Sequence, residues 1–157
     1  MTALGPFTPR EIAVIGATGS VGGAALDICR KHPDRFSVTA LAGHENVSRM
    51  AALAAEFNPR LVAMVDPAAA RRLETLVPGN TLVLSGKGSL EEIALHPDSG
   101  HLVFASSGTD AIPSLMSALS AGKTVSLANK ESLVIAGPWV MPLVSGKEQL
   151  RPLDSEH

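Results

Sequence analysis

The sequence has a single cysteine, no cluster of basic residues and no long apolar run. Cys29 is the only cysteine among 157 residues, which excludes an internal disulfide and fits a reducing cytoplasm. With a net charge of −2 and no basic cluster, the chain is not expected to bind nucleic acid or an anionic membrane. No apolar run reaches transmembrane length. Residues 1–10, MTALGPFTPR, lack the features of a signal peptide and are predicted to form a flexible tail.

The sequence does contain enough apolar residues for the core of one domain. Hydrophobic residues make up 45% and charged residues 18% of the chain, which is typical of a globular protein. Strands are predicted over 11–15, 36–43, 61–65, 81–85, 101–106 and 124–128, and helices over 21–31, 47–57, from 67 onwards and over 111–120. Asn46 is expected to cap the helix over 47–57, and Asp66-Pro67 to begin the next. This alternation predicts an α/β, Rossmann-like fold with a doubly wound, mostly parallel sheet.

Two further predictions concern side-chain packing. Apolar residues at helical spacing indicate the buried face of the helix over 21–31, and they are Ala24, Ala25, Ile28 and Cys29. Trp139 follows Pro138, which is expected to open a last helix, and the tryptophan is expected to lie in the core.

The first chemical signal is the segment GATGSVG, in which Gly16, Gly19 and Gly22 are spaced three apart. It follows a predicted strand and opens a predicted helix, the context in which such a loop binds a dinucleotide. Glycines permit a tight turn and let backbone N–H groups approach a pyrophosphate at the positive end of the helix. Thr18 and Ser20 add hydroxyl groups there. The segment predicts a cofactor loop, with close packing as the alternative reason for its glycines.

The second signal is the segment SLANKESLV, over 126–134. Asn129, Lys130 and Glu131 follow a predicted strand, at the edge of the sheet where ligands of open α/β sheets bind. An adjacent Lys–Glu pair in a loop is usually a solvated surface feature. A lysine at this edge is also suited to holding an anionic substrate. The third signal is PLDSEH, where Asp154 and Glu156 either solvate a tail or form half of a metal site.

GATGSVG, LANKESLV and PLDSEH, in this order and at these separations, resemble the 1-deoxy-D-xylulose 5-phosphate reductoisomerase family over about residues 11–157. ALDICRKHPDRFSVTAL and NVSRM are also similar to that family. The family belongs to non-mevalonate isoprenoid biosynthesis. It converts 1-deoxy-D-xylulose 5-phosphate to 2-C-methyl-D-erythritol 4-phosphate by an intramolecular rearrangement and a reduction with NADPH, using Mg²⁺, Mn²⁺ or Co²⁺. The resemblance implies an oxidoreductase and isomerase with a small sugar phosphate as substrate, and a homodimeric parent enzyme.

The resemblance also implies roles for individual residues. The cofactor-binding residues would be Thr18, Gly19, Ser20 and Val21 at the pyrophosphate, Asn46 near the adenosine, and Asn129 and Glu131 beside the nicotinamide. Lys130 and Glu156 would be catalytic and bind the substrate, together with Ser155.

Asp154 and Glu156 match two of the family's metal carboxylates. Residues i and i+2 of an extended segment share one face, so both can reach one ion. Hard divalent cations prefer such oxygen ligands and would polarise the substrate's oxygens. By this resemblance, residues 11–150 form the dinucleotide-binding domain and 151–157 begin the catalytic, metal-binding region. Because family members are much longer, the chain alone is expected to be inert.

Two departures from the family leave alternatives open. Glu45 stands where the family often has Lys or Arg, and an acid there is typical of NAD binding. We nevertheless expect NADPH to be preferred, with His44, Asn46 and Ser48 as donors to its 2′-phosphate. The segment over 104–114, FASSGTDAIPS, has less glycine and alanine than is usual in the family. The alternatives are another GATG-loop reductase, of the semialdehyde dehydrogenase kind, and a stand-alone nucleotide-binding module.

Overall fold

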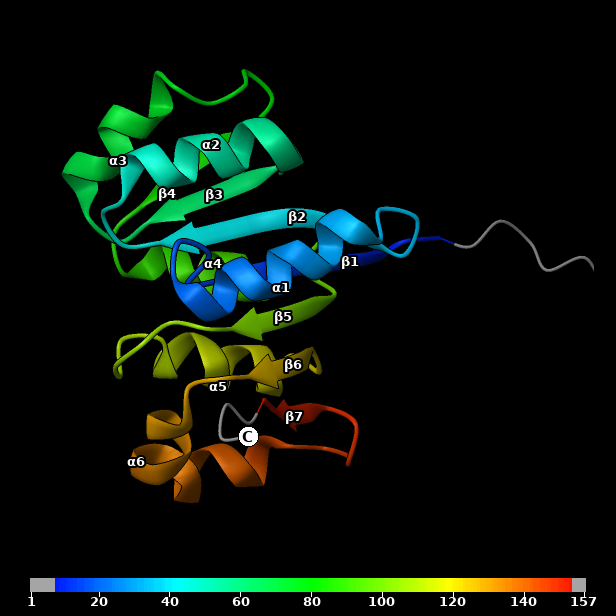
Figure 1. Ribbon diagram of the computed structural model, residues 1–157. Helices are drawn as coiled ribbons and strands as arrows, with labels where there is room; N and C mark the ends of the chain where they lie inside the picture. Colours follow the sequence, from blue (N-terminus) through cyan, green and yellow to red (C-terminus); the bar gives the residue numbers. More distant parts are fainter. Residues whose placement is uncertain (1–7, 154–157) are drawn as a thin grey trace, which may run out of the picture.

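Residues 8–153 are described by a computed structural model, in which one parallel sheet carries helices on both faces (Figure 1). The strands are β1 (Arg10–Ile15), β2 (Phe36–Gly43), β3 (Leu61–Met64), β4 (Leu82–Ser85), β5 (His101–Phe104), β6 (Thr124–Leu127) and β7 (Leu150–Pro152). The helices are α1 (Ser20–Lys31), α2 (Val47–Phe57), α3 (Pro67–Glu74), α4 (Gly88–Leu95), α5 (Ile112–Ser120) and α6 (Lys130–Val140), followed by the 3-10 helix η1 (Met141–Leu143).

The order of the strands places a crevice in the middle of the sheet. The seven strands lie in the order β4-β3-β2-β1-β5-β6-β7, and each neighbouring pair is parallel. The chain winds outward from β1 to β4, returns to β5 beside β1, and winds outward again to β7 (Figure 1). The connections after β1 and β5 therefore diverge, and ligands bind at such switch points. The predicted α/β, Rossmann-like, doubly wound sheet is confirmed.

Alternating side chains of the central strands supply two hydrophobic cores. In β1, Ile12 and Val14 pack with α1, α2 and α3 on one face of the sheet. Ala13 and Ile15 pack with α4, α5 and α6 on the other. Because both faces are covered, the central strands read as continuous apolar runs.

Two helices begin where the sequence predicts. The Oδ1 atom of Asn46 accepts a hydrogen bond of 3.1 Å from the backbone N–H of Arg49 at the start of α2. The Oδ2 atom of Asp66 accepts one of 3.2 Å from the N–H of Ala69, and Pro67 is the first residue of α3. Both caps satisfy N–H groups that the first turn of a helix leaves unpaired. Among the described residues, no helix is long and apolar enough to cross a membrane.

Several local predictions are wrong. Helix α4 was not predicted from the sequence. Lys130 and Glu131 lie in the first turn of α6 rather than in a loop. Pro138 lies inside that helix instead of opening one, and Trp139 is 63% exposed rather than part of the core. Asn129 caps a helix that begins at Lys130, eight residues before Pro138. In that helix Trp139 lies on the outer face.

The buried face of α1 also differs from the predicted one. Gly22, Leu26 and Cys29 are buried, whereas Ile28 is 55% exposed. The predicted burial of Cys29 is confirmed, and burial raises the pKa of its thiol. Helical spacing identifies candidate faces, but contacts with the rest of the fold select among them. Here the close approach of Gly22 to Gly16 and Ala17, in the loop after β1, selects the buried face.

The buried His101 at the start of β5 predicts a loss of stability at acidic pH. Its Nε2 atom lies 2.8 Å from the Oγ atom of Ser126, and its Nδ1 atom is buried without a hydrogen-bond partner. Burial, with the charges of Arg10 and Arg151, lowers the pKa of His101 below its ordinary value of 6.5. As the pH falls below 6.5, the histidine of the unfolded chain takes up a proton more readily than the buried His101 of the folded chain. The free energy of unfolding should therefore decrease with falling pH.

Unfolding by urea at several pH values checks this expectation. His101→Asn should flatten the decrease in the free energy of unfolding below pH 6.5, because the titrating group is gone. The control His32→Asn changes an exposed histidine and should keep the decrease. If the free energy of unfolding of His101→Asn depended on pH as that of the unmodified chain does, His101 would not be the source of the decrease.

Candidate functional site

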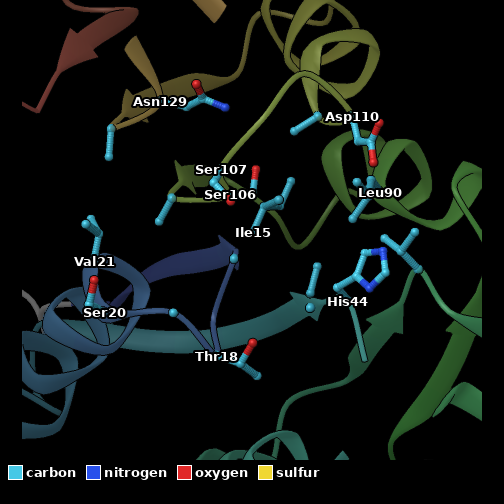
Figure 2. Close-up of a pocket in the computed structure, with 18 of the residues that line it drawn as sticks. Ile15, Thr18, Ser20, Val21, His44, Leu90, Ser106, Ser107, Asp110 and Asn129 are labelled. Carbon is cyan, nitrogen blue, oxygen red and sulfur yellow. The ribbon is translucent and has the colours of Figure 1, made fainter. Parts of the chain in front are cut away.

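A cavity of about 510 Å³ lies at the carboxyl ends of the central strands (Figure 2). Its walls are the β1–α1 loop, the ends of β2 and β3, the β5–α5 loop and the start of α6. This is the switch point of the sheet, and the volume is typical of a small-molecule site.

The three glycines of the segment GATGSVG, two in the β1–α1 loop and one in the first turn of α1, are needed for different reasons. Gly16 has a φ of +85°, and a Cβ atom there would lie 2.5 Å from the backbone nitrogen of Ser106. A Cβ atom at Gly22 would collide with the carbonyl oxygen of Gly16. At Gly19, by contrast, a Cβ atom would contact only the oxygen of Gly16, at an ordinary 3.6 Å. Packing therefore explains Gly16 and Gly22, whereas Gly19 is exposed and leaves space in the cavity that a side chain would fill.

The same loop presents the start of α1 to the cavity. Gly19 is the N-cap of α1 and provides no side-chain hydrogen bond, unlike Asn46, Asp66 and Asn129 at the starts of α2, α3 and α6. Ser20 and Val21, in the first turn, line the cavity together with Gly19 and with Thr18 (Figure 2). An uncapped helix start offers unpaired N–H groups and a partial positive charge, which together suit a phosphate group.

The β5–α5 loop belongs to the segment 104–114, which the sequence associated with the floor of the pocket without naming any site residue in it. Ser106, Ser107 and Asp110 line the cavity (Figure 2). The Oγ atom of Ser106 is buried without a hydrogen-bond partner, so it is a candidate donor to a bound ligand. The signal that would have found these residues is their position directly after a strand at the carboxyl edge of the sheet.

Asn129 joins two walls of the cavity. It is 4% exposed, and its Nδ2 atom donates a hydrogen bond of 2.6 Å to the carbonyl oxygen of Gly108. Its Oδ1 atom accepts one of 3.2 Å from the N–H of Ser132. The side chain thus caps α6 and holds the β5–α5 loop against it. Asn129 and Glu131 line the cavity, while the exposed Lys130 between them is outside its walls.

At the opposite end, the residues after β2 divide into two groups. The imidazole of His44 lines the cavity, next to Leu90 (Figure 2). Asn46 is exposed, caps α2 and does not line the cavity, and Glu45 is exposed beside it. The structure therefore places His44, rather than Asn46, on the cavity wall at this end.

The predicted metal ligands lie outside the described residues. Asp154, Ser155 and Glu156 follow the last described residue, Leu153. Within residues 8–153, no group of three or more His, Cys, Asp and Glu side chains could hold a metal ion. The metal site therefore stays a prediction.

A parallel sheet with a glycine-rich loop and an uncapped helix start at its switch point defines a dinucleotide-binding protein of the Rossmann type. The chain belongs to the 1-deoxy-D-xylulose 5-phosphate reductoisomerase family, whose family model matches residues 12–137. This membership confirms the resemblance seen in the sequence and excludes a reductase of the semialdehyde dehydrogenase kind.

Relatives and solved structures agree with this membership. The reductoisomerase of Anaeromyxobacter sp. (strain K) is 42% identical over 149 residues, which are 94% of this chain and 38% of the relative. That of Aromatoleum aromaticum is 43% identical over 159 residues, covering 97% of this chain and 39% of the relative. The Zymomonas mobilis enzyme, solved in complex with NADPH, has a TM-score of 0.87 and 35% identity, over 96% of this chain and 40% of that one.

A further solved structure, a DOX-P reductoisomerase in complex with NADPH, fosmidomycin and magnesium, has a TM-score of 0.82 and 37% identity. The match covers 92% of this chain and 36% of that one. The chain thus spans less than half the length of the relatives it matches.

Proposed function

We propose that this chain is the NADPH-binding domain of a 1-deoxy-D-xylulose 5-phosphate reductoisomerase. The enzyme would convert 1-deoxy-D-xylulose 5-phosphate to 2-C-methyl-D-erythritol 4-phosphate by rearrangement and reduction. The observation that carries the proposal is the cavity at Gly19, where an uncapped helix start meets space that no side chain fills. Solved members of the family in complex with NADPH support it.

The β1–α1 loop would hold the pyrophosphate of NADPH. The backbone N–H of Gly19 already donates a hydrogen bond of 3.2 Å to the carbonyl oxygen of Gly16, which holds the turn. The N–H groups of Ser20 and Val21 would donate to the phosphate oxygens beside Gly19, and the hydroxyl groups of Thr18 and Ser20 would add further bonds. Close approach of the phosphate is feasible because Gly19 has no side chain. At the adenosine end, His44 on the wall and Asn46 beyond it would contact the nucleotide.

The opposite end of the cavity would receive the nicotinamide, which supplies the hydride when NADPH is bound. Asn129 is held by two hydrogen bonds and gives this end a rigid wall, with Glu131 and the unpaired hydroxyl of Ser106 nearby. A rigid wall favours one orientation of the ring.

Lys130 would bind the anionic substrate just outside these walls, as a positive charge on a flexible stem. Asp154 and Glu156 would hold Mg²⁺, Mn²⁺ or Co²⁺, and Ser155 and Glu156 would also contact the substrate. A divalent metal, when bound, polarises oxygen atoms of its substrate. We further propose that the whole enzyme is a homodimer and acts in the cytoplasm, where a single buried thiol such as Cys29 stays reduced.

The chain alone is expected to bind NADPH and to prefer it over NADH. Gly19→Ala should weaken NADPH binding by roughly tenfold to a hundredfold, because its methyl group enters the pyrophosphate site, while stability changes little. Titration followed by fluorescence or calorimetry measures both dissociation constants. The control Gly79→Ala adds a methyl group where no atom lies within 4 Å, before β4 at the other edge of the sheet.

Two results would count against this assignment. A folded chain that binds neither nucleotide would refute the dinucleotide site. A clear preference for NADH would show that Glu45 selects the ribose hydroxyl and that the 2′-phosphate is excluded.

A further inference from the structure

Ser106 carries a hydroxyl group that the fold itself does not use. The residue is the second after β5 and lines the cofactor cavity. Its Oγ atom is buried and makes no hydrogen bond to any residue within 8–153. A buried hydroxyl group without a partner costs free energy, so its presence on a cavity wall indicates that a ligand supplies the partner.

Ser106 differs from the other buried polar atoms of this kind by its position at the cavity. In the described part of the chain, the Oγ atom of Ser99 and the Nδ1 atom of His101 are also buried without a hydrogen-bond partner. Ser99 precedes β5 by two residues and His101 is the first residue of that strand, and neither lines the cavity. Ser99 and Ser106 are therefore similar hydroxyl groups at opposite ends of β5, and only that of Ser106 is at the ligand site.

Ser106 lies between the two walls that a bound dinucleotide would contact. On the side of β1, its backbone nitrogen is the atom nearest to a Cβ atom built on Gly16. On the side of β6, the N–H of Ala128 donates a hydrogen bond of 2.8 Å to the carbonyl oxygen of Phe104, and Asn129 follows directly. Figure 2 shows Ser106 between Asn129 and the β1–α1 loop.

We propose that Ser106 is a cofactor-binding residue whose hydroxyl group forms a hydrogen bond with the ribose on the nicotinamide side of NADPH. This ribose joins the pyrophosphate, which the proposed function places at Gly19, to the nicotinamide, which it places at Asn129. The hydroxyl groups of ribose and serine can each donate and accept, so the bond forms without any charge. This inference rests on the proposed function, because that function supplies the dinucleotide.

The two neighbouring parts of NADPH are less suitable partners for this hydroxyl group. The pyrophosphate lies towards β1, where the uncapped start of α1 offers N–H groups to it. The nicotinamide lies towards β6, beside Asn129 and Glu131. Because β5 is the strand between β1 and β6, Ser106 is closest to the sugar that connects these two groups.

Three nucleotides that differ by one group at a time test the assignment on the 157-residue chain. The first, 2′-phospho-ADP, has no second ribose; 2′-phospho-ADP-ribose adds that ribose, and NADPH adds the nicotinamide. Ser106→Ala removes the hydroxyl group, and Ser99→Ala is the matched control at the other end of β5. Calorimetric titration, with displacement of NADPH for the weaker ligands, measures the dissociation constants.

Ser106→Ala should weaken the binding of NADPH and of 2′-phospho-ADP-ribose by the same factor, roughly threefold to tenfold, and leave that of 2′-phospho-ADP unchanged. Ser99→Ala should leave all three dissociation constants unchanged. The urea midpoint of the nucleotide-free chain should not decrease in either variant, because neither hydroxyl group has a partner within residues 8–153 to lose.

Several results would overturn the inference. An unchanged affinity of Ser106→Ala for NADPH would show that the hydroxyl group does not contact the cofactor. Weaker binding of 2′-phospho-ADP would reassign the contact to the pyrophosphate, and a loss confined to NADPH would reassign it to the nicotinamide. A lower urea midpoint in Ser106→Ala would mean that the hydroxyl group stabilises the fold instead.

The unmodified chain separates this inference from the proposed function. If it binds NADPH while Ser106→Ala binds equally well, the ribose contact is refuted and the proposed function stands. If the folded, unmodified chain does not bind NADPH, the proposed function is refuted, and with it the inference.

Discussion

Replacing Gly22 with alanine is expected to lower the free energy of unfolding by about 1–3 kcal/mol or more and to abolish NADPH binding. The new Cβ atom would overlap the carbonyl oxygen of Gly16 and approach the backbone of Ala17. Both obstacles are backbone atoms at a tight turn, so neither can move without distorting the loop. Because the same loop forms the pyrophosphate site, the distortion should affect binding as well as stability.

Gly23→Ala is the matched control for this experiment. A Cβ atom at Gly23 would lie 3.8 Å from the Nη2 atom of Arg49, the end of a flexible side chain. Since alanine also favours the helix interior, Gly23→Ala should be neutral or stabilise the chain by about 0.5–1 kcal/mol. Urea unfolding and NADPH titration of both variants provide the measurements. A Gly22→Ala protein with normal stability and affinity would show that the helix is not packed on the loop as described.

Removing either terminal carboxylate is expected to reduce turnover by roughly a hundredfold or more in a chimera in which residues 1–157 replace the matched region of the Anaeromyxobacter relative. Asp154→Asn and Glu156→Gln preserve the shape of each side chain but remove the negative charge that a divalent cation requires. NADPH affinity should stay nearly unchanged, because the pyrophosphate loop is formed by other residues, Thr18 to Val21.

Steady-state turnover at several Mg²⁺ or Mn²⁺ concentrations, with NADPH titration in parallel, distinguishes loss of the metal from loss of the cofactor. Glu148→Gln is the control, because Glu148 is an exposed acid a few residues earlier in the sequence and forms an ion pair with Arg151. Near-normal turnover in either terminal variant would mean that the acids only solvate the end of the chain.

Local signals in the sequence were sufficient for most of the framework. The buried strands appear as short β-branched runs, because a sheet covered on both faces places apolar residues at every position. Asn46 and Asp66 mark the starts of α2 and α3, because a capping side chain acts within three residues of the chain. The spacing of the glycines after β1 also indicates the cofactor loop, because the turn and the helix that form this loop follow each other directly in the sequence.

Predictions that depended on contacts between distant segments were less successful. Trp139 and Ile28 were expected inside, but the packing of α6 and α1 against their neighbours leaves both exposed. Helix α4 has no side-chain hydrogen bond at its N-cap, so no capping residue in the sequence indicates where it begins.

The sequence by itself determined the fold class, the family and the position of the cofactor loop, because these depend on order and spacing along the chain. Only the tertiary structure showed that Gly16 and Gly22 serve packing while Gly19 leaves room for a ligand. The distinction depends on where each Cβ atom would point, and for Gly16 the obstacle is Ser106, ninety residues away in sequence but adjacent across the sheet. The tertiary structure likewise revealed that Asn129 joins α6 to the β5–α5 loop through Gly108. The contact of Gly16 with Ser106 and that of Asn129 with Gly108 both form only when the strands β1, β5 and β6 lie side by side in the sheet.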